Sequence, residues 1–160
     1  MKISVITVCY NSSQTIEKTI LSVKNQTYKN IEYIIVDGNS QDGTVAIIKK
    51  HSDVVSKWIS ESDKGLYDAM NKGIIMASGD LIGILNADDV FNNQFVIEEI
   101  ASFHDKNDID GSVGNIVQHK ENGKILRHYS SNPWKPEKLR IGVMPPHPSI
   151  FLKRDLFSRF

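Results

Sequence analysis

The sequence predicts an α/β protein built on a doubly wound, mostly parallel sheet. Short runs rich in β-branched residues recur along the first half, and the segments between them carry the apolar spacing of helices. Strands that alternate with helices form parallel sheets with right-handed crossovers and helices on both faces. We expect the strand order 3-2-1-4 for the four predicted strands, at residues 3–8, 31–36, 55–60 and 81–85.

Three helices are predicted between these strands. Asn11 and Gln14 have the spacing of a capping box ahead of the first helix, and the second follows a turn at Asp42. The apolar stripes expected to face the sheet are Ile16, Ile20 and Val23 in the first helix, Val45 and Ile48 in the second, and Tyr67, Met70 and Ile74 in the third.

The pattern changes after Asp89, and we divide the domain into residues 1–89 and 90–160. The second part predicts a helix, a strand near residues 113–117 and a hairpin at Asn122-Gly123, followed by a proline-rich loop. The helix carries Val96, Ile100 and Phe103 on one side, and Leu156, Phe157 and Phe160 predict the start of a last helix whose apolar face has nothing to pack against.

Composition fits one globular domain, with 40% hydrophobic and 24% charged residues among 160. No stretch approaches the roughly 18 apolar residues of a membrane span, and the opening turns polar too early for a signal peptide, so we expect a cytoplasmic protein. The single cysteine, Cys9, is expected to be a buried, inert thiol. Residues 1–119 are acidic and residues 120–160 are basic, which fits either ordinary surface charge or a face for phosphates or anionic lipid.

Adjacent carboxylates follow the fourth predicted strand, in Asn86-Ala87-Asp88-Asp89. Like charges this close repel unless a cation or hydrogen-bond donors lie between them, and Mg²⁺ binds through one or two carboxylates plus substrate phosphates. Asp is also common in turns, but ligands of open α/β sheets bind beyond the carboxyl ends of the strands where the strand order reverses. That position favours a metal and phosphate site.

Asp37 follows the second predicted strand, where such sheets often place an acid that hydrogen-bonds a ribose or base; a plain turn before Gly38 is equally compatible. The loop after the first strand, residues 10–13, holds no glycine, which disfavours NAD, and no P-loop is present. Residues 61–73 are polar around one apolar stripe, typical of a solvated helix. The histidines lack metal spacing, and His147 alone has a rigid proline setting that suggests an aimed side chain.

Four motifs in sequence together resemble the inverting glycosyltransferases with the GT-A fold, of the family 2 type. The resemblance covers about ninety residues closely and extends more loosely to His147-Pro148-Ser149 and Phe157. The motifs are Ile6-Thr7-Val8-Cys9-Tyr10-Asn11, then Ile35-Val36-Asp37-Gly38-Asn39-Ser40 with Asp42-Gly43-Thr44, then Asp63 to Gly73, and finally Leu85-Asn86-Ala87-Asp88-Asp89.

The resemblance implies a role for each matching residue. Tyr10 would border the nucleobase, Asp37 and Asp63 would hydrogen-bond the base or ribose, and Asp88 with Asp89 would form the DXD-type pair, with Asp89 holding Mn²⁺ or Mg²⁺. Residues 1–89 would then be the Rossmann-like, nucleotide-sugar donor-binding half, and residues 90–160 a partial acceptor-binding half.

The resemblance also implies what the sequence lacks. His147 would line the diphosphate or acceptor side, but the family's general base would lie in a segment just after Phe160, so the chain resembles a C-terminally truncated member. We therefore expect the 160 residues alone to be marginally soluble and not a competent transferase.

The partners implied are a nucleotide-diphosphate sugar, UDP-linked, and a saccharide or lipid-linked acceptor in polysaccharide biosynthesis, with no nucleic acid. Peripheral association with the inner membrane face and a homo-oligomer are further expectations. Two alternatives remain open: a sugar-1-phosphate nucleotidyltransferase, which should show a glycine- and arginine-rich first loop, and a non-catalytic nucleotide-binding fragment.

Overall fold

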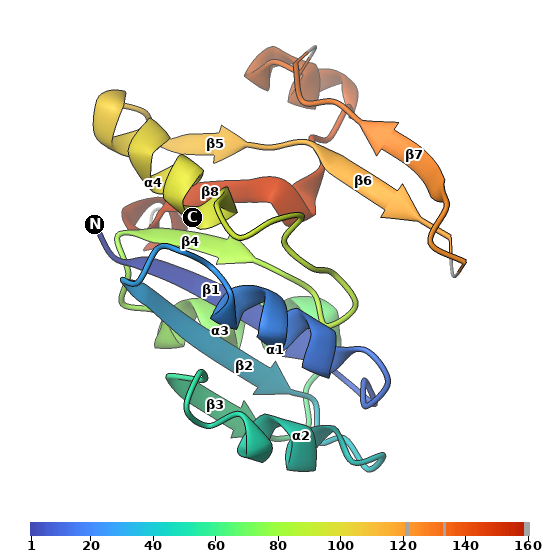
Figure 1. The fold of residues 1–160 in the computed structure, drawn as a ribbon. Coiled ribbons are helices and arrows are strands. Elements are labelled where there is room, and N and C mark those ends of the chain that lie inside the picture. Colours follow the sequence, from blue (N-terminus) through green and yellow to red (C-terminus); the bar gives the residue numbers. More distant parts are fainter. Residues whose placement is uncertain (121, 133, 159–160) are drawn as a thin grey trace.

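The computed structural model describes residues 1–120, 122–132 and 134–158. Strands and helices alternate strictly through the first half (Figure 1). These elements are β1 (Ile3–Cys9), α1 (Ile16–Lys24), β2 (Ile31–Asp37), α2 (Thr44–Lys50), β3 (Lys57–Ser60), α3 (Leu66–Met76) and β4 (Leu81–Ile84). The second half holds α4 (Val96–Lys106), β5 (Gly111–Val113), β6 (Ile116–His119), β7 (Ile125–Tyr129) and β8 (Ile150–Lys153), with short 3₁₀ helices η1 (Pro136–Ile141), η2 (His147–Ser149) and η3 (Arg154–Ser158).

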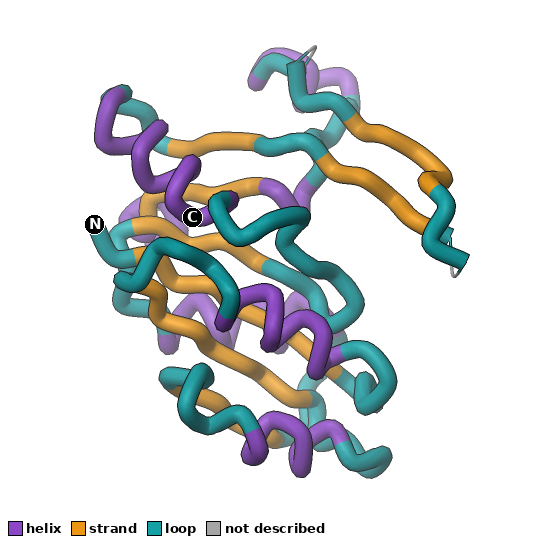
Figure 2. Tube along the Cα trace, viewed as in Figure 1, coloured by secondary structure: helices purple, strands orange, loops and turns teal. Residues whose placement is uncertain are grey.

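The central sheet has the strand order β3-β2-β1-β4-β8-β5. Strands β1 to β4 run parallel in the predicted order 3-2-1-4, which confirms the doubly wound, mostly parallel sheet. Strand β8 pairs antiparallel with both β4 and β5 and so connects the second half to the first (Figures 1 and 2). Strands β6 and β7 form a separate hairpin that extends away from this sheet.

Helices cover both faces of the sheet because side chains along each strand alternate between faces. One core joins Ile3 and Val5 of β1 to α1, α2 and α4, including the predicted stripe of α1. The other joins Ile6 and Val8 to α3. Strand β1 is buried along its whole length, as expected for the centre of a doubly wound sheet.

Three local predictions were wrong for identifiable reasons. Thr15 precedes α1 without a side-chain cap, because the Asn11 side chain instead accepts a hydrogen bond from Gln41 N. Tyr67 and Phe103 were predicted to face the sheet but are exposed. Helix α3 buries the predicted Met70 together with Ala69, and α4 buries Ile97 and Ala101, each one position after a predicted stripe residue.

The region near residues 113–117 is two strands in different sheets, and β8 was not predicted. Gly83 of β4 explains how β8 fits, because a Cβ there would lie 2.2 Å from the Phe151 ring. The last predicted helix is the 3₁₀ helix η3. Its Phe157 packs against the core that includes α3, whereas the sequence predicted no partner for this residue. Phe160 lies outside the described residues. No helix in the described ranges is long and apolar enough to cross a bilayer.

Glu32 is a buried carboxylate that connects three strands at the amino end of the sheet. Its side chain is 3% exposed and accepts hydrogen bonds from Ser4 Oγ at 2.7 Å and from Ser78 N at 2.7 Å. Ion pairs to Lys57 and Lys2 span 2.9 and 3.1 Å. Burial opposes the charge, but these hydrogen bonds outweigh it and hold the pKa of Glu32 well below its usual range.

We expect Glu32→Gln to lower the free energy of unfolding by roughly 1.5–3 kcal/mol at pH 7, because it removes hydrogen bonds to a charged group. The folded pKa is depressed, so the contribution is present above the unfolded pKa near 4.3 and is lost as pH falls. Urea unfolding of both proteins from pH 7 to pH 3 measures this. Asp53→Asn, in the exposed pair with Lys24, should leave the free energy of unfolding nearly unchanged. An equal loss for both variants would contradict the role given to Glu32.

Candidate functional site

An open hollow of about 1090 Å³ lies at the carboxyl ends of β1 and β4. Strand β1 has β2 on one side and β4 on the other, so the strand order reverses here, as the sequence predicts. The segment after β1, the start of α3 and the segment after β4 form its walls. The lining residues used below are Tyr10, Asp63, Asn86 and Asp88.

Backbone N–H groups of the loop after β1 donate hydrogen bonds to side chains of the segment after β2. Asn11 N donates to Ser40 Oγ at 2.8 Å, and the reverse bond runs from Gln41 N to Asn11 Oδ1 at 3.0 Å. Asn11 has φ +48°, a conformation that Asn tolerates better than most residues. Further bonds join Ser12 N to Thr44 Oγ1 at 2.8 Å and Ser13 N to Asp42 Oδ2 at 2.9 Å. The wall of the hollow is therefore held in place before any ligand binds.

Asp37 lies beneath this loop and is fully buried. One carboxylate oxygen accepts hydrogen bonds from Ser40 N at 2.9 Å and from Ser60 Oγ at 2.7 Å, and the other accepts from Ser40 Oγ. The Cys9 thiol lies 3.5 Å away and is buried, as predicted, and burial followed by the Asp37 charge raises the pKa of Cys9. The structure therefore places Asp37 behind the wall of the hollow, with neighbours occupying its oxygens.

Asp63 and Tyr10 meet over Gly38 at the rim. A Cβ on Gly38 would lie 2.6 Å from Asp63 Oδ2 and 3.3 Å from the Tyr10 ring, so only glycine leaves room for both. Gly65 N donates to the other Asp63 oxygen at 2.8 Å and fixes the carboxylate. Tyr10 is 66% exposed and presents an open aromatic face. An aromatic ring beside an accepting carboxylate can stack a planar base and accept its N–H group.

Asp88 and Asp89 lie at the opposite side of the same hollow, after β4. Asp88 is exposed, whereas Asp89 is half-buried and receives a 3.2 Å hydrogen bond from Asn86 Nδ2. Burial and then the Asp88 charge raise the pKa of Asp89, and the Asn86 bond and nearby His147 oppose this rise. Asn86 Oδ1 is buried and has no hydrogen-bond partner, a feature of the site that the sequence did not predict.

His147 belongs to η2, which packs against β4. Its imidazole is exposed, and its positive charge is one of the groups that oppose the raised pKa of Asp89. The structure thus brings together Tyr10 and Asp63 at one side and Asp88, Asp89 and His147 at the other.

The oxygen donors suit a hard divalent cation. Asp88 and Asp89 supply adjacent carboxylates, their mutual repulsion favours a cation, and Asn86 adds an unpaired carbonyl oxygen. No group of three or more His, Cys, Asp or Glu residues in the described ranges could hold a metal by itself. A cation here would complete its coordination with ligand oxygens, as Mg²⁺ does with substrate phosphates.

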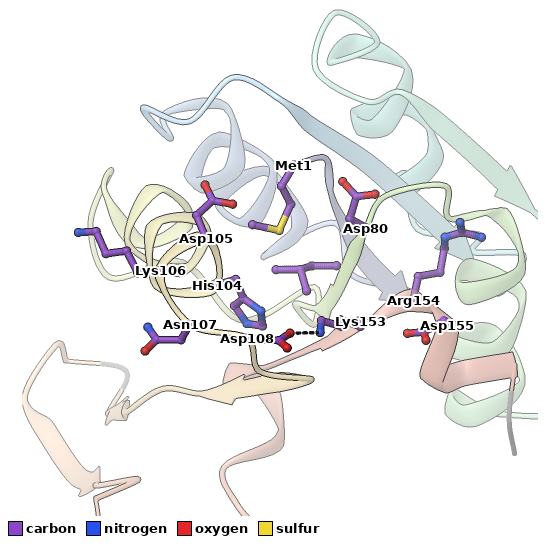
Figure 3. A pocket seen from close by; sticks show the side chains of 11 residues that line it. Met1, Asp80, His104, Asp105, Lys106, Asn107, Asp108, Lys153, Arg154 and Asp155 are labelled. Carbon is purple, nitrogen blue, oxygen red and sulfur yellow. Dashed lines mark hydrogen bonds and ion pairs between the residues drawn. The ribbon is translucent and has the colours of Figure 1, made fainter.

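A second hollow, of about 560 Å³, lies at the other end of the sheet, where β1 and β4 begin (Figure 3). Asp105, Asp108 and Asp155 line it, and Lys153 bridges Asp108 at 3.3 Å and Asp110 at 3.2 Å. These acids therefore lie at the opposite end of the sheet from Asp88 and Asp89.

The family model for glycosyl transferase family 2 matches residues 4–153. The chain belongs to glycosyl transferase family 2. This match includes every candidate site residue, from Tyr10 to His147.

Curated relatives agree with the family 2 assignment. An uncharacterized glycosyltransferase of Haemophilus influenzae is 32% identical over 83% of this chain and 43% of its own length. The Escherichia coli enzyme named UDP-Glc:alpha-D-GlcNAc-diphosphoundecaprenol beta-1,3-glucosyltransferase WfaP is 30% identical over 92% of this chain and 53% of its own length. The chain thus spans about half the length of these family 2 relatives.

Solved structures confirm the GT-A fold of this family 2 chain. TarS from S. aureus in complex with UDP-GlcNAc matches with a TM-score of 0.78 at 22% identity, covering 99% of this chain and 47% of TarS. Mannosyltransferase PcManGT from Pyrobaculum calidifontis, in complex with GDP-Man and Mn²⁺, matches with a TM-score of 0.70 at 20% identity, covering 99% and 46%.

We expect two acids of this family 2 site to differ in their effect on folding. Asp37→Ala should lower the free energy of unfolding by roughly 1–3 kcal/mol, because it removes the fully buried acceptor of three hydrogen bonds from Ser40 and Ser60. Asp63→Ala, at the open rim, should lower it by less than about 1 kcal/mol. Urea unfolding of the two variants measures the difference. Similar losses would show that Asp37 is not the buried anchor described above.

Proposed function

We propose that this chain is the donor-binding part of an inverting glycosyltransferase that transfers a sugar from a UDP-sugar to an acceptor hydroxyl with the help of a divalent cation. The observation that carries the proposal is the hollow at the reversal of strand order, which is lined by Tyr10 and Asp63 and, after β4, by Asp88, the neighbour of Asp89. Family 2 membership supports the reaction class.

The nucleoside would occupy the Tyr10 end. The exposed ring gives a stacking surface, and the Asp63 carboxylate, held by Gly65 N, accepts the N–H of a uracil base or a ribose hydroxyl. Asp37 would act indirectly by holding the Ser40 loop, and through it Asn11, in position. This arrangement keeps the wall rigid, so little conformational entropy is lost when the nucleotide binds.

The diphosphate would lie toward Asp88 and Asp89. These residues, with Asn86 beside them, would hold the cation, which when bound neutralises the charge that develops on the leaving diphosphate. His147 would also lie on that side, because its 3₁₀ helix η2 packs against β4, the strand that precedes Asp88 and Asp89. PcManGT, whose complex contains GDP-Man and Mn²⁺, supports a divalent cation in this fold.

Inversion requires an acceptor hydroxyl that is held in line and deprotonated by a positioned carboxylate, a transfer typically worth 10²–10⁴-fold. Asp105, Asp108, Asp110 and Asp155 are excluded because they lie at the other end of the sheet. We propose that the base comes from a part of the whole protein beyond these 160 residues. The relatives, which are about twice as long, support this.

A nucleotidyltransferase is less well supported. Its first loop should be rich in glycine and arginine, whereas the loop after β1 is Tyr10-Asn11-Ser12-Ser13 and is held by hydrogen bonds to the loop after β2.

We expect Mn²⁺ to tighten UDP binding by roughly tenfold or more, because bare carboxylates otherwise face the diphosphate. Asp89→Asn should abolish this metal dependence, while Asp63→Asn should weaken UDP binding both with and without Mn²⁺. Titration calorimetry of the full-length protein, in Mn²⁺ and in EDTA, distinguishes the two effects.

Asp105→Asn, at the other end of the sheet, is the matched control and should bind UDP like the unmodified protein. Equal UDP affinity in Mn²⁺ and EDTA would remove the cation from the proposal. Absence of UDP binding in both would refute the donor site itself.

A further inference from the structure

One basic segment of the chain has no role in the donor site. We call residues 116–144 the arm; it comprises the β6–β7 hairpin, η1 and their connections, and it extends away from the main sheet in Figure 1. The arm has six Lys or Arg and two Glu, although the whole chain is balanced at 19 of each sign. The rest of the chain therefore carries 13 basic and 17 acidic residues, so the positive charge is concentrated in the arm.

The arm also concentrates exposed apolar side chains. In the described ranges, fifteen large apolar residues are exposed, and seven of them belong to these 29 positions. Ile141 is 77% and Met144 is 67% exposed, and every residue of β7 is exposed. The seven are Ile125, Leu126, Tyr129, Leu139, Ile141, Val143 and Met144.

Hydrogen bonds connect the segments of the arm to one another and to its base. Trp134 Nε1 donates to Val143 O at 3.1 Å and closes the turn around η1, and Ser131 N donates to Asn115 Oδ1 at 2.8 Å at the base of the hairpin. The Arg127 guanidinium lies 4.3 Å from the centre of the Tyr129 ring. Apolar groups interleaved with Lys and Arg, and a Tyr beside an Arg, are the composition of surfaces that lie at a membrane interface.

We propose that the arm binds the surface of an anionic lipid bilayer. Its cations attract anionic headgroups, while Ile141, Met144 and their apolar neighbours enter the boundary between headgroups and acyl chains. The net negative remainder of the chain is repelled by the same surface, so the arm is the part that faces the bilayer. A second copy of the arm is a poorer partner, because pairing would bring two surfaces of net charge +4 together.

The position of the arm has a consequence for the acceptor. The arm leads directly into η2, which packs against β4, the strand that ends just before Asp88 and Asp89, so bilayer contact would bring the proposed phosphate side of the hollow near the lipid surface. A lipid-linked acceptor would then need to extend only its sugar into the site. This link rests on the proposed function, whereas the bilayer contact does not.

Vesicle flotation of the full-length protein tests the proposal. It should bind phosphatidylcholine vesicles that contain phosphatidylglycerol and should bind pure phosphatidylcholine at least roughly tenfold more weakly, because each Lys or Arg near an anionic surface contributes about fivefold. Lys124→Glu with Arg140→Glu should reduce binding by a similar factor, and Ile141→Ser with Met144→Ser should reduce it at every salt concentration. Lys18→Glu with Ile75→Ser makes the same chemical changes at exposed sites of α1 and α3 and should have no effect.

Equal binding to the two kinds of vesicle, or equal losses for the arm variants and the α1/α3 control, would overturn the proposal. So would a concentration-dependent dimer in sedimentation that the arm variants abolish, because the arm would then be an interface between copies. UDP titration of the same proteins separates the two proposals: the arm variants should retain UDP binding, and a protein that floats with vesicles but binds no UDP would contradict only the proposed function.

Discussion

The site depends on one constraint, the parallel pairing of β1 with both β2 and β4. Because three parallel strands end at the same edge, the residues that follow them, which are 28 or more positions apart in the sequence, become neighbours. The burial of β1 on both faces fixes this register, since a slip of one residue would turn Ile3 and Val5 toward the core occupied by Ile6 and Val8.

Rigidity at that edge comes from side chains that bind the main chain. Asp37 supports Ser40, Ser40 supports Asn11, and the Asn11 side chain returns a bond to Gln41. Gly38 then leaves the space in which Asp63 and Tyr10 meet. A buried acid thus shapes the site without entering it, which separates a residue that is needed for folding from those that can touch a ligand.

Much of this could be predicted from local pattern. Alternating strand and helix periods were enough to predict the sheet order and its ligand edge, because β-branched runs and helical stripes are strong signals when several agree. The prediction failed where tertiary contacts decide. The strand β8 is only four residues long and forms because Phe151 finds space above Gly83, a contact between positions 68 residues apart that no local pattern reports.

The same dependence on contacts between distant residues limits what the sequence can predict about the site. Asp37 and Asp63 have the same residue type and similar settings in the sequence, yet Asp37 is enclosed by Ser40 and Ser60, whereas Asp63 lies at the rim. The sequence likewise could not predict the unpaired Asn86 oxygen, because its burial depends on packing from several segments. Sequence predicts which chemical groups gather at an edge, and the fold decides which of them remain accessible.

The antiparallel insertion of β8 also affects how the chain reaches its native state. Strand β4 has β1 on one side, but its other edge stays open until residues 150–153 arrive. During synthesis at roughly 5–20 residues per second, this edge of β4, which is paired in the folded protein, is exposed for several seconds with unpaired N–H and C=O groups. Closing a loop of this length is slow relative to local helix formation, so we expect β4 to gain its second neighbour later than its contacts with β1.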